Sequence, residues 1–355
     1  MFSFRTTPLS EQMDTKLLSG KVGCFVTQNC YDVHSGKWMW ELFKERGILK
    51  QVFTPKEAEL CPGTNHIEFK AEDIAALDAV VVEIQDAGVR YFNYTKDVMR
   101  LIETLCLLGD EAPSLYIVDH INPAGRIVEG TIPSIESELY VPKVAHRHGL
   151  TLGELCNLYY NELNARFPLH IISAAASDTV RQLLPWTIPP ASDIPGLFTC
   201  ALYSGGGLWN NTSITPGIGT TRPYEFIGAP FIRPLDTSSL PQAAGAILRP
   251  ASFTPAAGKY AGERCQGFQI IPVAGEPYHS FLHTLRLIRW FIEHYSQFTI
   301  DPAFYLKVAD PVIAEYIEGN IGFDIVSEHV KGEEQKWIRK AKRYTLYEDQ
   351  PYRIK

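Results

Sequence analysis

The chain has 355 residues and a formal net charge of −7 at pH 7. Its composition, 45% hydrophobic and 21% charged with 24 prolines and 26 glycines, is ordinary for a globular protein of enzyme size. A chain of this length exceeds the size at which single cores stop growing, so two domains are expected. The acidic balance argues against a general affinity for nucleic acid.

The cysteines and the apolar runs indicate the compartment. Seven cysteines are scattered along the chain without a CxxC pair, which is typical of reduced thiols in a cytosolic protein. The first residues lack a long apolar run before a small-residue cleavage site, and no run approaches the ~18 apolar residues of a membrane span. We therefore expect a cytoplasmic protein with no membrane partner; the sequence leaves its oligomeric state open.

Strands and helices alternate along the first half of the chain. Strands are predicted at residues 21–27, 48–54, 79–82, 114–118 and 169–174, and helices at 36–46, 72–77, 95–108 and 151–163. The run Val80, Val81 and Val82 shows no polar alternation, as in a strand covered on both faces. This order implies right-handed βαβ units and a doubly wound parallel sheet, an α/β fold of Rossmann-like type.

Polar side chains follow the predicted strands at the point where each strand ends. They are Gln28 and Asn29, then Thr54, then Glu83, Gln85, Asp86 and Arg90, and finally Asp119 and Asn122. Ligands of open α/β sheets bind outside the carboxyl ends of the strands, so this convergence predicts a polar site. The other interpretation is a loop in which Asp86 and Arg90 pair with each other and brace the next helix; these residues alone favour neither.

The second half of the chain differs from the first in composition and pattern. Residues 185–195 are too rich in proline for regular structure, and residues 204–225 form a long segment rich in Gly, Thr and Asn. Its apolar and aromatic flanks favour an ordered loop, and long loops of this kind are usually functional when they are ordered. A further strand is predicted at 268–273, with helices at 278–297, 309–318 and 333–344.

Several familiar motifs are absent or ambiguous. The glycines at 205–207 lack the spacing and context of a dinucleotide fingerprint, and there is no P-loop, so no nucleotide cofactor is expected. No GxSxG elbow supports a nucleophilic triad. His146 and His148 suit hydrogen bonding or substrate contact better than a metal site, because no further ligand has supporting spacing. Arg222 is suited to clamping a carboxylate or to forming a surface or interdomain ion pair.

Five motifs, read in order, resemble those of the YbbC/NamZ-like exo-β-N-acetylmuramidases. They are EIQDAGVRYFNY from Glu83, VDHINPAG from Val118, RHGLTLGE from Arg147, GIGTTRPYEFIGAP from Gly217, and the set Phe253, Thr254, Pro255, Lys259, Gly262, Cys265 and Gly267. The corresponding family motifs are D-I-Q-D-V-G-x-R-[FY]-Y-[TN]-Y, L-D-R-P-N-P-x-G, R-H-G-M-T-x-G-E, G-R-G-T-T-R-P-F-E-x-I-G-A-P and F-x-P…K-x-x-G-x-x-C-x-G. The resemblance runs over nearly the whole chain.

This resemblance implies an architecture and an activity. It implies a Rossmann-like N-terminal domain over residues 1–180 and a smaller C-terminal α+β domain over 181–355, with the active site in the cleft between them. The implied reaction releases N-acetylmuramic acid from the non-reducing ends of peptidoglycan fragments, as in peptidoglycan recycling. The implied partner is a small carbohydrate, a muropeptide or an amino-sugar disaccharide, and no cofactor or metal is implied.

The resemblance also suggests roles for individual residues. The catalytic acid would be Glu83 or Asp86, or Glu57 if the loop that contains it shifts by one residue. One well-placed acid suffices where the substrate's acetamido group replaces the nucleophile. Arg90 and Arg222 would hold the lactyl carboxylate. The other substrate-binding candidates are Asn29, Gln85, Tyr94, Asp119, Asn122, His148, Asn210, Thr220 and Thr221.

The chain also departs from the family's motifs. A family glutamate falls on Lys56, and the Gly-rich loop has Asn210, Pro216 and Ile218 where the family has two acids and an arginine. A second hypothesis is therefore a catalytically lapsed homologue that keeps the sugar cleft as a binding module. A third, an interaction scaffold without a sugar site, has less support because Asp86, Arg90, Asn122 and Arg222 remain.

Overall fold

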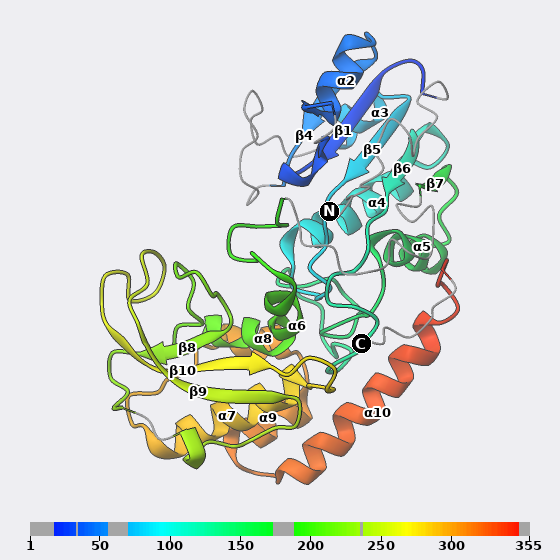
Figure 1. Ribbon diagram of the computed structural model, residues 1–355. Helices are drawn as coiled ribbons and strands as arrows, with labels where there is room; N and C mark the ends of the chain where they lie inside the picture. The colour runs from blue at the N-terminus through cyan, green and yellow to red at the C-terminus, as the bar shows by residue number, and fades with distance from the viewer. Residues whose placement is uncertain (1–17, 33–34, 56–69, 173–187, 235–236, 348–355) are drawn as a thin grey trace.

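The computed structural model describes residues 18–32, 35–55, 70–172, 188–234 and 237–347 (Figure 1). Two of the positions discussed above, Lys56 and Glu57, lie outside these ranges. The predicted domain boundary after residue 180 also lies outside them, so the domain limits stay a prediction. No helix within the described ranges is long and apolar enough to cross a membrane.

A parallel sheet forms the centre of the N-terminal half. Among the described residues its strand order is β4-β1-β5-β6-β7, with every neighbouring pair parallel. The strands are β1 (Val22–Val26), β4 (Leu49–Phe53), β5 (Ala79–Glu83), β6 (Ser114–Val118) and β7 (Leu169–Ile172). This arrangement confirms the predicted doubly wound α/β sheet, in which the chain order reverses between β1 and β5.

The helices of this half cover the sheet as their apolar spacing predicts. They are α2 (Met39–Glu45), α3 (Ala71–Ala75), α4 (Asn93–Leu108) and α5 (Leu152–Glu162); the short strands β2 (Tyr31–Asp32) and β3 (Lys37–Trp38) form a small ribbon before α2. Helix α5 begins with a capping box, in which Thr151 Oγ1 accepts from the Glu154 amide and the Glu154 carboxylate accepts from the Thr151 amide.

An antiparallel sheet with helices packed against it forms the C-terminal half. Its described strand order is β8-β10-β9, and its core is shared with α7 and α9. The elements are β8 (Phe226–Ala229), β9 (Ala246–Phe253), β10 (Cys265–Pro272), α7 (Ser280–His294), α8 (Ala303–Val308) and α9 (Pro311–Glu318). Strands β8 and β9 and helix α8 were not predicted; β9 carries Arg249 and Pro250 in its middle, which weakens any strand pattern.

The glycines at 205–207 belong to helices, not to a loop. Helix α6 (Leu197–Gly206) continues into the 3-10 helix η5 (Gly207–Asn211). A Cβ on Gly205 would lie 2.3 Å from the Ser280 carbonyl oxygen, and one on Gly207 would lie 2.5 Å from the Tyr91 ring. These glycines therefore allow α6 to pack closely on α7 and on the N-terminal half. The sequence did not predict this helix there, because glycine has a low helix propensity.

The last helix, α10 (Phe323–Ala341), runs from the C-terminal half to the N-terminal half and ends near α5 (Figure 1). Trp337 of α10 is fully buried in the N-terminal core, and its Nε1 donates to the His148 carbonyl at 2.8 Å. Near the end of α10, Lys340 pairs with Glu162 of α5 at 2.7 Å. The two halves are therefore joined by packing as well as by the chain.

Arg90 is a fully buried charge at the junction of the two halves. Its side chain is 0% exposed, and its Nη1 donates to the Thr131 carbonyl at 2.6 Å. Its Nη2 donates to the carbonyls of Lys307 and Val308, the last residues of α8, at 2.9 and 2.7 Å. Burial lowers the pKa of Arg90 to about 10, so the guanidinium stays charged at neutral pH, next to the negative end of a helix.

We predict that Arg90→Met lowers the free energy of unfolding by ~3–5 kcal/mol, because several buried carbonyls lose their donors at once. Arg90→Lys is expected to restore only part of this loss, since an ammonium cannot match the planar fork. Urea unfolding measures both. The control is Arg249→Met on exposed β9, expected within ~0.5 kcal/mol of the parent. An Arg90→Met change as small as the control's would contradict the prediction.

Candidate functional site

The carboxyl edge of the parallel sheet is the candidate site. Strands β1 and β5 are neighbours, with Val26 opposite Glu83, and the chain turns to opposite sides of the sheet after each of them. A switch of this kind leaves a crevice outside the strand ends, where ligands of open α/β sheets bind. The arrows of the sheet point toward the C-terminal half (Figure 1), so this edge faces the junction of the two halves.

Glu83 and His120 form a pair at this edge. Glu83 ends β5, His120 follows β6 by two residues, and Glu83 Oε1 lies 3.2 Å from His120 Nε2. The side chains are 10% and 26% exposed, so both retain some access to solvent. Burial alone would lower the pKa of His120, but the hydrogen bond and charge of Glu83, with a smaller effect of Asp119, raise it. The pair therefore holds a proton further into the neutral range than an isolated histidine.

Asp86 is buried among protein partners. Its Oδ1 accepts from Thr95 Oγ1 at 2.7 Å, and its Oδ2 lies 3.1 Å from His148 Nε2. The Leu150 amide donates to His148 Nδ1 at 3.2 Å, which places the ring proton of neutral His148 on Nε2, facing Asp86. With its side chain only 3% exposed, Asp86 holds the start of α4 against the chain before α5.

Asp119 and Asn122 likewise organise the backbone of this edge. Asp119 accepts from the Gly153 amide and the His120 amide through Oδ1, at 2.8 and 3.0 Å. Asn122 donates to the Leu150 carbonyl at 2.8 Å and accepts from the Ala124 amide at 2.9 Å. Both side chains are almost fully buried, and we infer that they support the site rather than face a ligand.

The remaining candidates of the N-terminal half are also engaged with protein groups. Gln85 Nε2 donates to the carbonyls of Asp86 and Ile121, and Tyr94 lies in the N-terminal core. Asn29 Nδ2 donates to the Ile188 carbonyl at 2.6 Å, and the neighbouring Gln28 donates to the Pro190 carbonyl at 2.6 Å. The end of β1 therefore holds residues 188–190, the segment that leads into α6.

The C-terminal candidates form a second, more open group. Asn210, Thr221 and Arg222 are exposed, and the Arg222 guanidinium lies 3.4 Å from Glu225. Thr220 Oγ1 donates to the Gly217 carbonyl at 2.6 Å, which fixes the turn before Arg222. This group comes near the segment held by β1, because the Tyr224 hydroxyl, 3.4 Å from Asn210 Nδ2, donates to Asp193 at 3.2 Å.

The structure therefore separates Arg90 from Arg222, although the sequence suggested one shared role. Both terminal nitrogens of Arg90 donate to protein carbonyls inside the junction, whereas Arg222 is more than half exposed. We infer a structural role for Arg90. The fully buried His146 belongs to the same junction, and burial together with the charge of Arg90 holds its pKa well below the usual range.

Two functional candidates were missed from the sequence. His120 gave no signal of its own beyond its place directly after a predicted strand end. Glu129, four residues after the second family motif, is fully buried and accepts from Ser204 Oγ at 2.6 Å, the Phe281 amide at 2.9 Å and Arg147 Nη1 at 2.5 Å. Burial raises the pKa of Glu129, but Arg147 and His279 outweigh it, so the pKa is lowered. Glu129 is thus a charged link between the halves.

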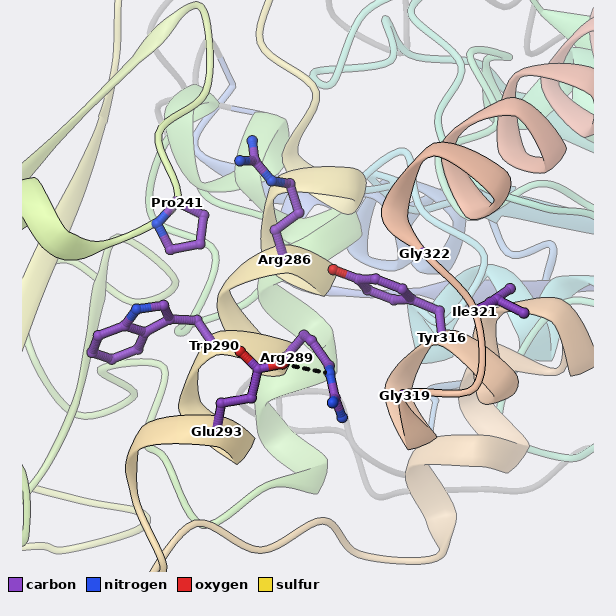
Figure 2. A pocket seen from close by; sticks show the side chains of 9 residues that line it. All are labelled: Pro241, Arg286, Arg289, Trp290, Glu293, Tyr316, Gly319, Ile321 and Gly322. Atoms are coloured by element: carbon purple, nitrogen blue, oxygen red, sulfur yellow. Dashed lines mark ion pairs between the residues drawn. The ribbon is translucent and has the colours of Figure 1, made fainter.

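A hollow on the C-terminal half lies apart from the sheet edge. It has a volume of about 370 Å³ and lies between α7 and α9, with Arg286, Arg289 and Tyr316 on its walls (Figure 2). Arg289 Nη1 donates to the Ile317 carbonyl at 3.0 Å and its Nε pairs with Glu293 at 3.0 Å, while Arg286 donates to a loop carbonyl. These cations stabilise the end of α9 and its surroundings. The candidate site therefore stays at the edge of the parallel sheet and not in this hollow.

The fold and the polar sheet edge define a two-part α/β protein of a kind that commonly binds small ligands. Family models described as "Exo-beta-N-acetylmuramidase NamZ, N-terminal" and "C-terminal" match residues 63–195 and 201–347. The chain belongs to this family, as its motifs predicted.

Individual relatives agree with this assignment. The chain is 26% identical over 292 residues to the peptidoglycan beta-N-acetylmuramidase NamZ of Bacillus subtilis (strain 168), covering 78% of this chain and 69% of the relative. Crystal structures of two DUF1343 family proteins from Bacteroides fragilis NCTC 9343 have the same fold. They match 96% of this chain and 98% or 97% of their own, with TM-scores of 0.75 and 0.77 and identities of 19% and 20%.

We predict that Thr95→Val lowers the free energy of unfolding by ~1–3 kcal/mol, because it leaves buried Asp86 Oδ1 without its donor. Chemical denaturation measures the loss. The matched control is Thr104→Val in the same helix. The Thr104 hydroxyl donates to the Arg100 carbonyl at the surface, so the free energy of unfolding is expected to change by no more than ~0.5 kcal/mol. Equal effects of the two variants would argue against a bracing role for Asp86.

Proposed function

We propose that this protein is a glycosidase that releases N-acetylmuramic acid from the non-reducing ends of peptidoglycan fragments. The observation that carries the proposal is the match of both halves of the chain to one family of exo-β-N-acetylmuramidases. The Bacillus relative, named as a peptidoglycan β-N-acetylmuramidase, supports the same substrate class. We further propose a muropeptide or amino-sugar disaccharide as substrate, a role in peptidoglycan recycling and, from the scattered cysteines, a cytoplasmic location.

We propose Glu83 as the carboxylate that transfers the proton to the leaving group. Among the described catalytic candidates, Asp86 is closed in by Thr95 and His148, whereas Glu83 keeps a partly open face. His120 supports this role, because the pair retains a proton that a solitary glutamate would lose at neutral pH. Glu57 remains an alternative that lies outside the described residues.

The proposed reaction needs one protein acid. The Glu83–His120 pair donates a proton to the glycosidic oxygen while the bond from that oxygen to the anomeric carbon breaks. The acetamido oxygen of the N-acetylmuramic acid unit attacks the anomeric carbon of that same unit in place of a protein nucleophile. Water then opens the cyclic intermediate and returns a proton to the pair. This route explains how a chain without the family's glutamate at position 56 can remain active.

We propose that the loop at 217–222 binds the sugar. The exposed guanidinium of Arg222 is suited to a charge-assisted, bidentate contact with the lactyl carboxylate of N-acetylmuramic acid. Asn210 and Thr221 are exposed nearby in the sequence and can contact hydroxyl groups. The segment at 188–193 contacts both this group and the end of β1, which supports a site between the two halves.

The activity test uses a chromogenic β-N-acetylmuraminide, with the β-N-acetylglucosaminide as a control. We expect release from the muraminide alone. Glu83→Gln is expected to lower kcat/KM by ~10²–10⁴-fold, because it removes the proton donor while retaining size. Glu276→Gln, at an exposed loop position, is the matched control and is expected to retain full activity. A fully active Glu83→Gln enzyme would move the acid to another residue.

The pH dependence follows from the raised pKa of His120. Because the protonated pair is the active form, kcat/KM is expected to be maintained below that pKa and to fall as the pH rises through it. His120→Gln removes the titrating ring, so its profile should lose this descending limb as well as overall rate. Profiles of kcat/KM measured for both proteins test this. If the His120→Gln profile has the same descending limb as the parent, the limb belongs to the titration of a different group.

A lapsed, sugar-binding homologue is the second candidate function. It is favoured by the residues of the Gly-rich loop, where Asn210, Pro216 and Ile218 replace two acids and an arginine of the family motif. Absence of hydrolysis of the muraminide, together with binding of N-acetylmuramic acid measured by calorimetry, would support this function. Measurable hydrolysis of a muramyl substrate would eliminate it.

A further inference from the structure

After α10 the described chain turns back over the N-terminal half. We name residues 344–347 the C-terminal strap. The Tyr344 carbonyl accepts from Asn157 Nδ2 at 3.1 Å, and the Leu346 amide donates to Glu154 Oε1 at 3.0 Å. The Tyr347 hydroxyl donates to Asp119 Oδ2 at 2.6 Å. The strap thus runs along α5 and ends at the candidate site's edge of the sheet.

Tyr344 packs against the N-terminal core, but the end of the strap beyond it is attached mainly by polar contacts. Leu346 is 46% exposed. Together with Tyr347 it borders a hollow of about 500 Å³ whose other walls include Tyr160 of α5 and Ile171 of β7. A segment that leaves such a space beneath it contributes little hydrophobic stabilisation there. The directed contact of Tyr347 with Asp119 therefore calls for an explanation other than core packing.

Asp119 connects this contact to the proposed acid. The carboxylate receives the Tyr347 hydroxyl on Oδ2 and the His120 amide on Oδ1, and His120 in turn faces Glu83. A short chain of contacts thus links the end of the described sequence to the pair at the switch point. Thr151 Oγ1 also donates to Oδ2 at 2.7 Å, so Tyr347 supplies one of two side-chain donors to that oxygen.

We propose that Tyr347 is a positioning residue of the active site, acting through Asp119 on the placement and protonation of His120. The proposal rests on the proposed function, in which the Glu83–His120 pair supplies the proton. Tyr347 itself is assigned no contact with substrate. The strap would make the catalytic pair depend on a segment more than 200 residues away in sequence.

The charges around His120 determine the direction in which loss of the Tyr347 hydroxyl shifts the pKa of His120. Glu83 from β5 and Asp119 beside it both raise the pKa of His120. Burial raises the pKa of Asp119, as does Glu154 of α5, whereas donation from Tyr347, Thr151 and Gly153 opposes that rise. Without the Tyr347 hydroxyl, Asp119 is less readily ionised. It then supports the charge of His120 less, so the pKa of His120 falls.

The test is an NMR titration of the His120 ring in the full chain, which requires no catalytic activity. Tyr347→Phe keeps the aromatic ring and removes the hydroxyl, and is expected to move the His120 midpoint to lower pH. Tyr344→Phe is the matched control, because the strap contact of Tyr344 uses its backbone carbonyl; its titration should follow the parent. In an Asp119→Asn background, Tyr347→Phe should add no further shift, since the ionisable relay is gone.

Kinetics give a second readout if the parent is active. Tyr347→Phe is expected to lower kcat about tenfold with KM little changed, the loss expected for one charge-assisted hydrogen bond, and to move the descending limb of the pH profile downward. An unchanged His120 titration in a folded Tyr347→Phe protein would overturn the proposal. Loss of the fold in this variant would overturn it too, because the hydroxyl would then be structural. An inactive parent with a shifted His120 would refute only the proposed function.

Discussion

The fold depends on a charge buried between its two halves. The Arg90 guanidinium follows the central strand β5 and donates to carbonyls at the end of α8, far along the sequence. A buried charge is costly unless protein groups pair with it, so the bonds from the Arg90 terminal nitrogens restrict the position of α8 relative to β5. That restriction places the polar residues after β5 at the junction, and the carboxyl edge of the sheet therefore faces the C-terminal half.

The acidic residues near this junction divide by exposure into supports and a reactive candidate. Asp119 and Glu129 each accept from several protein donors, whereas Asp86 accepts from Thr95 and lies 3.1 Å from His148; all three are closed to solvent. Glu83 has His120 as its partner, and its side chain is 10% exposed, against 3% for Asp86 and 0% for Glu129. Buried carboxylates that are fully paired hold loops rigidly, and a rigid surrounding is what positions a reactive group. In the function that we propose, this explains why so many polar residues gather around one reactive acid.

Much of this could be predicted from the sequence, and the limits have physical causes. Apolar runs and their spacing identified the parallel sheet and its helices, because those signals are local. The helical role of Gly205 depended on the distant Ser280 carbonyl, which no local pattern reveals. Arg90 and Arg222 both read as carboxylate clamps, because their chemistry is identical; only burial, a property of the folded chain, separates them.

The pair at the switch point also differs from the family's motifs in a way that affects its chemistry. Those motifs have aspartate and arginine where this chain has Glu83 and His120. An arginine keeps its proton throughout the working pH range, so an aspartate–arginine pair is a fixed ion pair. A histidine exchanges its proton near neutrality, and the longer glutamate side chain reaches it from the end of β5. In the function that we propose, the Glu83–His120 pair delivers a proton, which residues of the family type would not do if they formed a fixed ion pair, and it thereby replaces the family glutamate that falls on Lys56.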